Sequence, residues 1–129
     1  MVSDTPWKNF SRKELECKCG CGKMEMDSDF MHDIQRIRDR LGFPFVVTSA
    51  YRCEAHDRSV GGSSSPGHGP HTTGRAIDIA IRGANAWKLL QAAAGDFFRG
   101  IGVNQRGDRR FIHIDDIKDD TKRPALWSY

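Results

Sequence analysis

HTTGRAIDIAI, residues 71–81, is the stretch that decides the fold, because it carries a histidine and an aspartate into an apolar run. The part from Arg75 to Ile81 alternates and is apolar enough to predict a buried β-strand. A strand holds its side chains on rigid backbone at a fixed spacing. We therefore expect Asp78 to have a firm position within a sheet.

A second predicted strand, RRFIHID at residues 109–115, supplies further polar side chains. Side chains two residues apart on a strand share a face, so His113 and Asp115 should point the same way. Imidazole and carboxylate groups are donors that zinc accepts, and a hydrolytic zinc site takes three protein ligands and leaves the fourth position open. The sequence therefore predicts a Zn²⁺ site at His71, Asp78 and His113.

Asp115 is the candidate for a catalytic role beside this site. A bound zinc ion acidifies water and polarises a carbonyl group. Peptide hydrolysis also needs a group that carries a proton to the leaving amine, and a neighbouring carboxylate is the usual choice. The alternative is that Asp115 holds a ligand imidazole in its tautomer.

Two helices are predicted around these strands. The first follows Asp27, a plausible N-cap, and ends at Gly42. Its core-facing side chains recur at helical spacing: Phe30, Ile34, Ile37 and Leu41. The second helix runs from Ala84 to Ala94 and stops at Gly95. One face of this helix contains Trp87, Leu90 and Ala94.

The remaining segments predict further strands and one long loop. Short strands are expected at residues 43–48 and 100–103, and a turn at 104–108 leads to the strand at 109–115. Residues 54–70 are rich in Gly, Ser and Pro and predict a loop. Helices packed on a small antiparallel sheet make an α+β fold. The length of 129 residues fits one domain, residues 1–129.

Charge and hydropathy restrict the partners. The net charge is +3, which favours anionic surfaces only weakly. The arginines at 106, 109 and 110 lack a nucleic-acid motif or interleaved aromatic residues, so we expect no nucleic-acid partner. No stretch approaches the roughly 20 apolar residues of a membrane helix. The first residues lack the apolar run of a secretory signal. We expect synthesis in the cytoplasm and no stable membrane association.

The four cysteines are Cys17, Cys19, Cys21 and Cys53, three of them within CKCGCG at residues 17–22. In a reducing compartment such a cluster more often binds metal or stays reduced than forms a disulfide. On an extended strand Cys17 and Cys21 would lie about 13 Å apart, too far to share one ion. Gly20 and Gly22 would have to fold the segment back. A second metal site, free thiols and a disulfide to Cys53 remain open.

These motifs resemble the zinc DD-peptidases of peptidase family M15, whose fold is shared with hedgehog signalling domains. The first ligand segment of that family matches at His71, Gly74, Ala76 and Asp78, and the later ligand matches at His113. The likeness to small bacterial and phage members extends along most of the chain, to Phe10, Cys19–Gly22, Ser49–Cys53, His56, Val60–Gly62 and Trp127. The resemblance implies a hedgehog/DD-peptidase-like α+β fold.

The same resemblance implies a function and a substrate. It implies a zinc metallopeptidase that cuts peptidoglycan stem peptides, as a D-Ala-D-Ala carboxypeptidase or an endopeptidase. We expect a monomeric phage or prophage endolysin that acts on the cell wall, in the periplasm, once released. Arg52 matches the family arginine that steadies a substrate carboxylate or oxyanion, so it is a catalytic and substrate-binding candidate. Tyr51 and Ser49 of the same segment are further substrate-binding candidates.

Three positions depart from the family pattern. Arg110 stands three residues before the last ligand, where many relatives have an acidic residue. Gly69 stands where relatives often have Ser, and His68 is a competing candidate ligand. Arg110 favours an alternative function, that of a catalytically silent, zinc-stabilised module that binds the cell wall.

Overall fold

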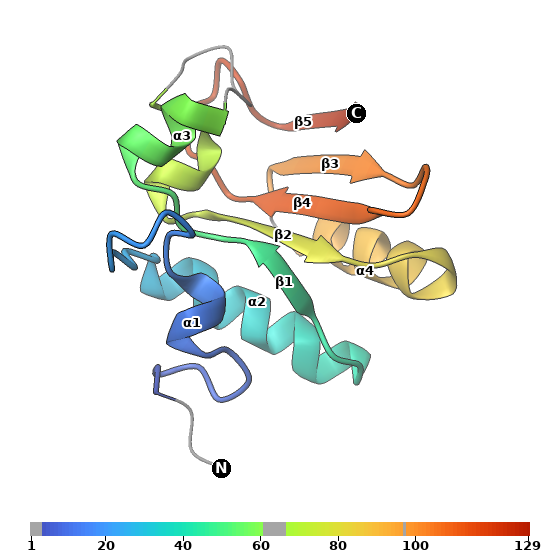
Figure 1. The fold of residues 1–129 in the computed structure, drawn as a ribbon. Coiled ribbons are helices and arrows are strands. Elements are labelled where there is room, and N and C mark those ends of the chain that lie inside the picture. The colour runs from blue at the N-terminus through green and yellow to red at the C-terminus, as the bar shows by residue number, and fades with distance from the viewer. Residues whose placement is uncertain (1–3, 61–66, 97) are drawn as a thin grey trace.

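The computed structural model describes residues 4–60, 67–96 and 98–129. Within these residues one mixed sheet forms, in the strand order β1-β2-β4-β3-β5 (Figure 1). The strands are β1 (Val46–Ser49), β2 (Ala76–Ala80), β3 (Gly100–Asn104), β4 (Phe111–Asp115) and β5 (Ala125–Ser128). The helices are α1 (Arg12–Leu15), α2 (Ser28–Leu41), α3 (Glu54–Val60), α4 (Gly83–Gly95) and the 3₁₀ helix η1 (Pro70–Thr73). The predicted α+β class is confirmed.

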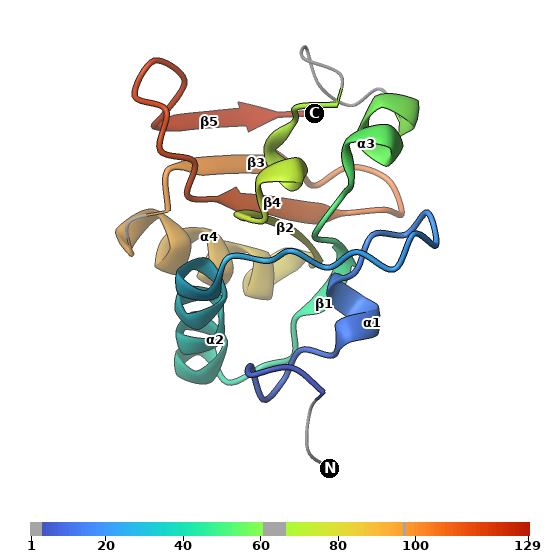
Figure 2. The ribbon, with the colours of Figure 1, turned by 90° about the vertical axis from the view of Figure 1, so that its left-hand side faces the viewer.

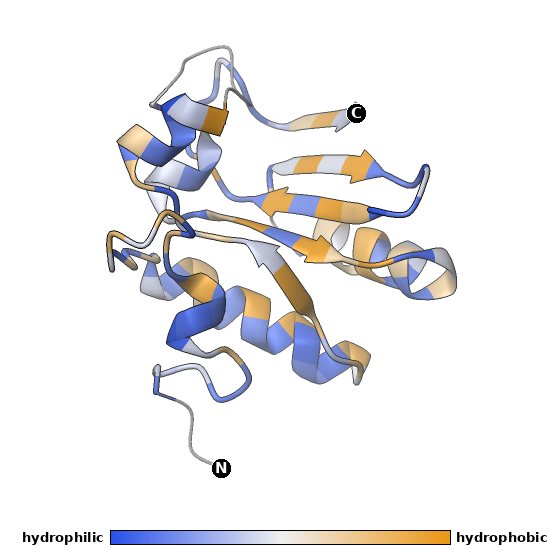
Figure 3. Ribbon diagram, viewed as in Figure 1, coloured by the Kyte–Doolittle hydropathy of each residue, from blue (hydrophilic) through white to orange (hydrophobic). Residues whose placement is uncertain are grey.

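The centre of the sheet is the antiparallel pair β2 and β4, where Asp78 lies opposite His113. Isoleucines alternate with these polar residues, and Figure 3 shows this alternation along both strands. The isoleucines at 77, 79, 112 and 114 are buried in the main hydrophobic core. Since successive side chains on a strand point to opposite faces, Asp78 and His113 project from the face away from this core.

Helix α2 confirms the sequence prediction. The Asp27 carboxylate accepts a hydrogen bond from the Phe30 backbone N–H at 3.0 Å, and the helix ends at Gly42. Its buried side chains are Phe30, Met31, Ile34 and Ile37. Helices α2 and α4 contact each other and lie together, away from α3 (Figure 2). None of the described helices combines the length and the apolar character that crossing a membrane requires.

The predicted face of α4 was wrong by one position. The buried side chains are Ala86, Leu89 and Ala93, whereas Trp87 is 62% exposed. Leu90 is half-buried and Ala94 is exposed. The cause is that this helix is alanine-rich, so small apolar side chains occur all round it and do not mark one face.

Two further expectations were wrong. The sheet is not wholly antiparallel, because β5 pairs parallel to β3. This strand is only four residues long, too short to show a periodic pattern. Residues 54–60 form α3 and not a loop, with Glu54 and Asp57 in the first turn, where carboxylates are favourable. Residues 61–66 of the expected loop lie outside the described residues.

Candidate metal centre

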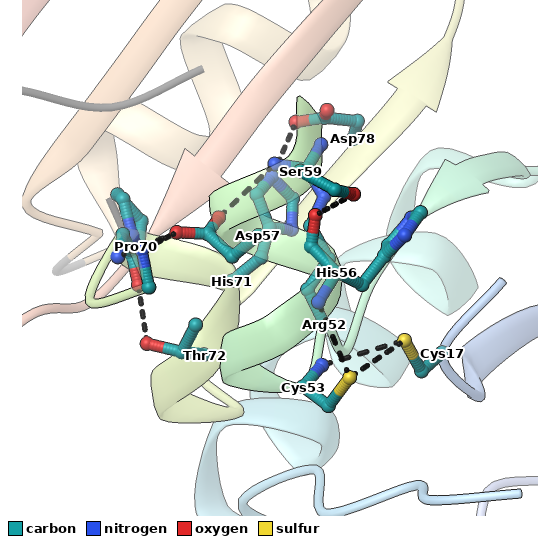
Figure 4. Close-up of polar contacts among 12 residues, drawn as sticks. Cys17, Arg52, Cys53, His56, Asp57, Ser59, Pro70, His71, Thr72 and Asp78 are labelled. Atoms are coloured by element: carbon teal, nitrogen blue, oxygen red, sulfur yellow. Dashed lines mark hydrogen bonds and ion pairs between the residues drawn. The ribbon is translucent and has the colours of Figure 1, made fainter. Parts of the chain in front are cut away.

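The structure brings the three predicted ligands together from three elements. His71 comes from η1, Asp78 from β2 and His113 from β4, and one donor atom of each lies within 4.8 Å of the others. The Asp78 Oδ1 atom is 3.3 Å from His71 Nε2 and 2.9 Å from His113 Nδ1. Figure 4 shows the His71 ring directed at Asp78. Two imidazole nitrogens and one carboxylate oxygen therefore converge on one point.

The outward-facing nitrogen of each imidazole has its own partner. His71 Nδ1 lies 2.7 Å from the Ala50 carbonyl oxygen, to which it can only donate. His113 Nε2 lies 2.7 Å from Asp115 Oδ2. Histidines that bind metals usually donate their second N–H to a carbonyl or carboxylate, which leaves the first nitrogen free to coordinate. His71 Nε2 and His113 Nδ1 are thus the nitrogens available to a metal ion, and the donor set fits one.

The charges around the centre favour a bound cation. Burial alone would raise the pKa of Asp78, but hydrogen bonds from His113 and His71 hold that pKa well below its usual range. Burial alone would lower the pKa of His113, yet the carboxylates of Asp115 and Asp78 hold it above the ordinary value. Both shifts mean that the carboxylates of Asp78 and Asp115 stabilise positive charge on the imidazole between them.

Asp115 shares a face with His113, as predicted, but its carboxylate is fully buried. Arg123 donates to both of its oxygens at 2.8 Å, from Nε to Oδ1 and from Nη2 to Oδ2. Burial raises the pKa of Asp115, but the hydrogen bonds from Arg123 and His113 lower it to about 2. Asp115 contacts the His113 nitrogen that faces away from Asp78. This placement favours the expected alternative, in which Asp115 orients His113.

Two glycines on β3 make room for this arrangement. Gly100 pairs with Asp115 and Gly102 pairs with His113 across the sheet. A Cβ atom on Gly100 would collide with the Asp115 carboxylate and with Arg123, and one on Gly102 would collide with the Trp127 indole. The alternating glycines of Gly100-Ile101-Gly102 were thus a sequence signal for groups that pack over this strand.

An open pocket of about 280 Å³ lies over the three donors. Its lining residues are Arg52, Asp57, Pro70, His71, Asp78, Phe111, His113, Trp127 and Tyr129. One side of the donor cluster is therefore accessible to a ligand, and the predicted residue Arg52 is on the wall.

Asp57 holds the pocket wall in place, and sequence reasoning missed it because residues 54–70 were read as a loop. Its side chain is 1% exposed. Oδ1 lies 3.4 Å from Arg52 Nη1, and Oδ2 accepts hydrogen bonds from the Gly67 and Gly69 backbone N–H groups. Figure 4 shows Asp57 between Arg52 and the η1 segment. Asp57 thus fixes both Arg52 and the backbone that leads to His71.

Other predicted residues lie elsewhere. Ser49 pairs with Asp78 across β1 and β2, and the buried Tyr51 donates its hydroxyl to Glu25 Oε2 at 3.0 Å. Among the described residues neither lines the pocket, so their contact with substrate stays a prediction. His68 is exposed and outside the donor cluster. Arg110 donates to the Gly107 carbonyl oxygen at 2.9 Å.

Residues 8–115 match the family described as Peptidase M15. The chain belongs to the peptidase M15 family. The resemblance drawn from the sequence is confirmed, and the matched region of this metallopeptidase family contains all three candidate ligands. No curated protein matches the chain.

Part of the pocket of this M15 peptidase lies beyond the matched region. Trp127 and Tyr129 line the pocket from β5 and the residue after it, and Arg123 precedes that strand. The Trp127 ring lies 5.2 Å from the His113 ring. The aromatic character of Trp127 and Tyr129 was visible in the sequence, whereas nothing local marked Arg123 as the partner of Asp115.

Proposed function

We propose that this M15 peptidase is a zinc-dependent enzyme that hydrolyses peptide bonds in peptidoglycan stem peptides. The observation that carries the proposal is the convergence of His71, Asp78 and His113 below an open pocket whose wall contains Arg52. Three protein donors with one open side are typical of hydrolytic zinc sites. A hedgehog/DD-peptidase-like fold and the role of a small phage or prophage endolysin are part of the proposal, from the sequence resemblance.

Zinc is proposed as the metal because the donors are two imidazole nitrogens and one carboxylate oxygen. When bound, the ion would polarise the scissile carbonyl and acidify a water molecule. The sheet register holds Asp78 and His113 in position, and the hydrogen bond to the Ala50 carbonyl oxygen holds His71.

Arg52 is proposed to bind the substrate. Its guanidinium lines the pocket and is 20% exposed, so it is accessible without being free in solvent. An arginine carries a permanent positive charge and a fork of donors, which suits a peptide carboxylate or a carbonyl oxygen that gains charge during attack. Asp57, which also lines the pocket, fixes the position of Arg52 through its contact at 3.4 Å.

For Asp115 we propose the positioning role and not the proton-carrying one. Its two oxygens are engaged by Arg123 and His113, and it is fully buried outside the pocket lining. A buried ionised carboxylate that accepts the second N–H of a ligand imidazole fixes its tautomer and strengthens it as a donor. Arg123 acts on the centre only through Asp115, which it keeps ionised and oriented.

Incubation of the zinc-loaded protein with purified peptidoglycan, followed by mass analysis of the released material, tests the function. Release of free alanine identifies a carboxypeptidase, and release of larger peptides identifies an endopeptidase. If peptidoglycans of several cross-link types yield neither product, the proposed enzyme activity is wrong.

A catalytically silent module that binds the cell wall is the second candidate. Two observations favour it. Arg110 replaces the acidic residue of many relatives and turns to the Gly107 carbonyl, and Asp115 is closed off from the pocket. This candidate predicts that the zinc-loaded protein sediments with insoluble peptidoglycan but releases no fragment from it. Cleavage of peptidoglycan by the wild-type protein would exclude this second candidate.

A further inference from the structure

The four cysteines form a second cluster of metal donors, away from the pocket. Cys17 and Cys53 are buried, whereas Cys19 and Cys21 are exposed. Their sulfur atoms all lie within 4.8 Å of one another. The Cys17 sulfur is 3.4 Å from that of Cys19 and 3.7 Å from that of Cys53, and the Cys19 and Cys53 sulfurs are 3.7 Å apart. Figure 4 shows the Cys17 and Cys53 sulfurs facing each other.

These spacings are those of a tetrahedral thiolate site. With zinc–sulfur bonds of about 2.3 Å, the edges of a regular tetrahedron of sulfur atoms are about 3.8 Å long. A disulfide requires two sulfurs at about 2.05 Å and a pair of residues that excludes the others. Here one sulfur, that of Cys17, is nearly equidistant from two others, and no pair is singled out. The geometry fits four ligands around one ion.

The backbone explains how the short CxCxC spacing can supply three ligands. Gly20 and Gly22 have φ angles of +87° and +80°, a left-handed conformation that glycine adopts without strain. They fold the segment back, as the sequence required, and the Cys17 N–H donates to the Lys23 carbonyl oxygen at 2.9 Å to close the loop. The Cys17 and Cys21 sulfurs therefore approach each other, as they could not do on an extended chain.

Backbone donors are also directed at the sulfurs. The Cys53 N–H lies 3.4 Å from the Cys17 sulfur, and the His56 N–H lies 3.4 Å from the Cys53 sulfur. Such N–H groups stabilise sulfur atoms that carry negative charge, as metal-bound thiolates do. The two buried cysteines are thus prepared for the charged form.

We propose that Cys17, Cys19, Cys21 and Cys53 bind a structural zinc ion, distinct from the centre at His71, Asp78 and His113. Four protein ligands complete the tetrahedron and leave no position for substrate, which is the property of structural sites. The ion would join the segment after α1 to the residue that precedes α3.

This second site would brace one wall of the pocket. Cys53 directly follows Arg52, whose backbone N–H donates to the His71 carbonyl oxygen at 3.2 Å. The Ala50 carbonyl accepts the hydrogen bond from His71 Nδ1, and the Tyr51 N–H donates to the Leu15 carbonyl at 3.1 Å. A crosslink at Cys53 would therefore restrain the segment that positions both Arg52 and His71.

Elemental analysis of the protein as purified tests the proposal, with two zinc ions per chain expected. The His71→Ala variant should keep one zinc. A protein with Cys19→Ser and Cys21→Ser should also keep one, and the combined variant none. The two exposed cysteines are chosen because their replacement leaves the core untouched. A cysteine variant with unchanged zinc content would overturn the proposal, and so would a single zinc in the wild type that His71→Ala removes.

Cobalt provides a readout that does not depend on activity. Co²⁺ bound by thiolates absorbs in the near ultraviolet through charge transfer from sulfur. This band should appear in the Co²⁺-loaded wild type and persist in His71→Ala, which lacks a complete catalytic centre. Absence of the band, or fewer than four alkylated thiols after metal removal and denaturation without reductant, would contradict the proposal. Either result leaves the proposed peptidase function unaffected.

Discussion

The two donor clusters of this chain differ in how they are built. The centre at His71, Asp78 and His113 has three donors, two of them fixed by adjacent strands, and one side open to a pocket. The cysteine cluster has four donors, three of them from one folded-back loop, and is outside the pocket lining. Three donors leave room for chemistry, whereas four close the coordination sphere.

The groups that contact the donor residues from outside also differ between the two clusters. The outward nitrogens of His71 and His113 have acceptors in Ala50 and Asp115, and Arg123 in turn supports Asp115. The Cys53 sulfur receives a backbone N–H from His56, three residues along the chain, whereas the Cys17 sulfur receives the N–H of Cys53, 36 residues away. The open centre is therefore supported by acceptors behind its imidazoles, whereas the cysteine cluster is supported by backbone N–H groups directed at its sulfurs.

Metal removal should separate the two centres most strongly. A chelator of moderate strength reaches the open centre through the pocket, so hydrolysis should fall to background when one zinc per chain has been lost. The second zinc should remain, because four thiolates leave the chelator no open position. Zinc content and hydrolysis are measured on the same samples, and added Zn²⁺ should restore activity. Full activity after removal of both ions would contradict a metal-dependent mechanism.

Arg52→Lys should affect the substrate and neither metal. We expect hydrolysis to fall by roughly 10² to 10³, the usual effect of losing a donor to a developing oxyanion. Lysine keeps the charge but not the fork of donors. Zinc content and the thermal melting temperature should match those of the wild type. Arg58→Lys, at an exposed position on α3, is the matched control and should retain full activity. Equal rates in both variants would make Arg52 a structural residue.

Asp115→Asn tests whether the open centre depends on the contact between Asp115 and His113 Nε2. As a positioning residue, Asp115 should affect zinc affinity, which we expect to weaken by about 10 to 100-fold, with hydrolysis recovered in excess zinc. The thiolate–cobalt band should not change. Asp108→Asn, at an exposed position, is the control. If zinc occupancy is complete and hydrolysis still falls by about 10² to 10⁴, Asp115 carries the proton after all.

Gly102→Ala should have a smaller effect, which is a loss of stability caused by a collision at the pocket wall. The added methyl group collides with the Trp127 indole, so β5 must shift. We expect the free energy of unfolding to fall by about 1 to 3 kcal/mol, as for other overpacked positions. Gly95→Ala, where a Cβ would meet nothing within 4 Å, is the control. Urea denaturation measures both. Equal stabilities would mean that Trp127 does not pack over Gly102.

The sequence predicted the parts of the molecule that follow a local period. Helix α2 and the positions of Asp78 and His113 were predicted because spacing on a helix or a strand fixes which side chains share a face. The buried face of α4 was missed because its alanines mark no side. Asp57 was missed because residues 54–70 were read as a loop. Arg123 and the parallel strand β5 were missed because no local pattern marks their pairing with Asp115 and β3. Local patterns located the candidate ligands, whereas the groups that support them are visible only in the folded structure.

The most direct test of the metal-dependent peptidase compares wild type and His113→Ala on one peptidoglycan preparation in the presence of zinc. Mass spectrometry follows the released products over time. We predict steady release by the wild type and none by the variant, which should remain folded and retain its cysteine-bound zinc. No release by the wild type, or equal release by both proteins, would contradict the assignment of this centre as the active site.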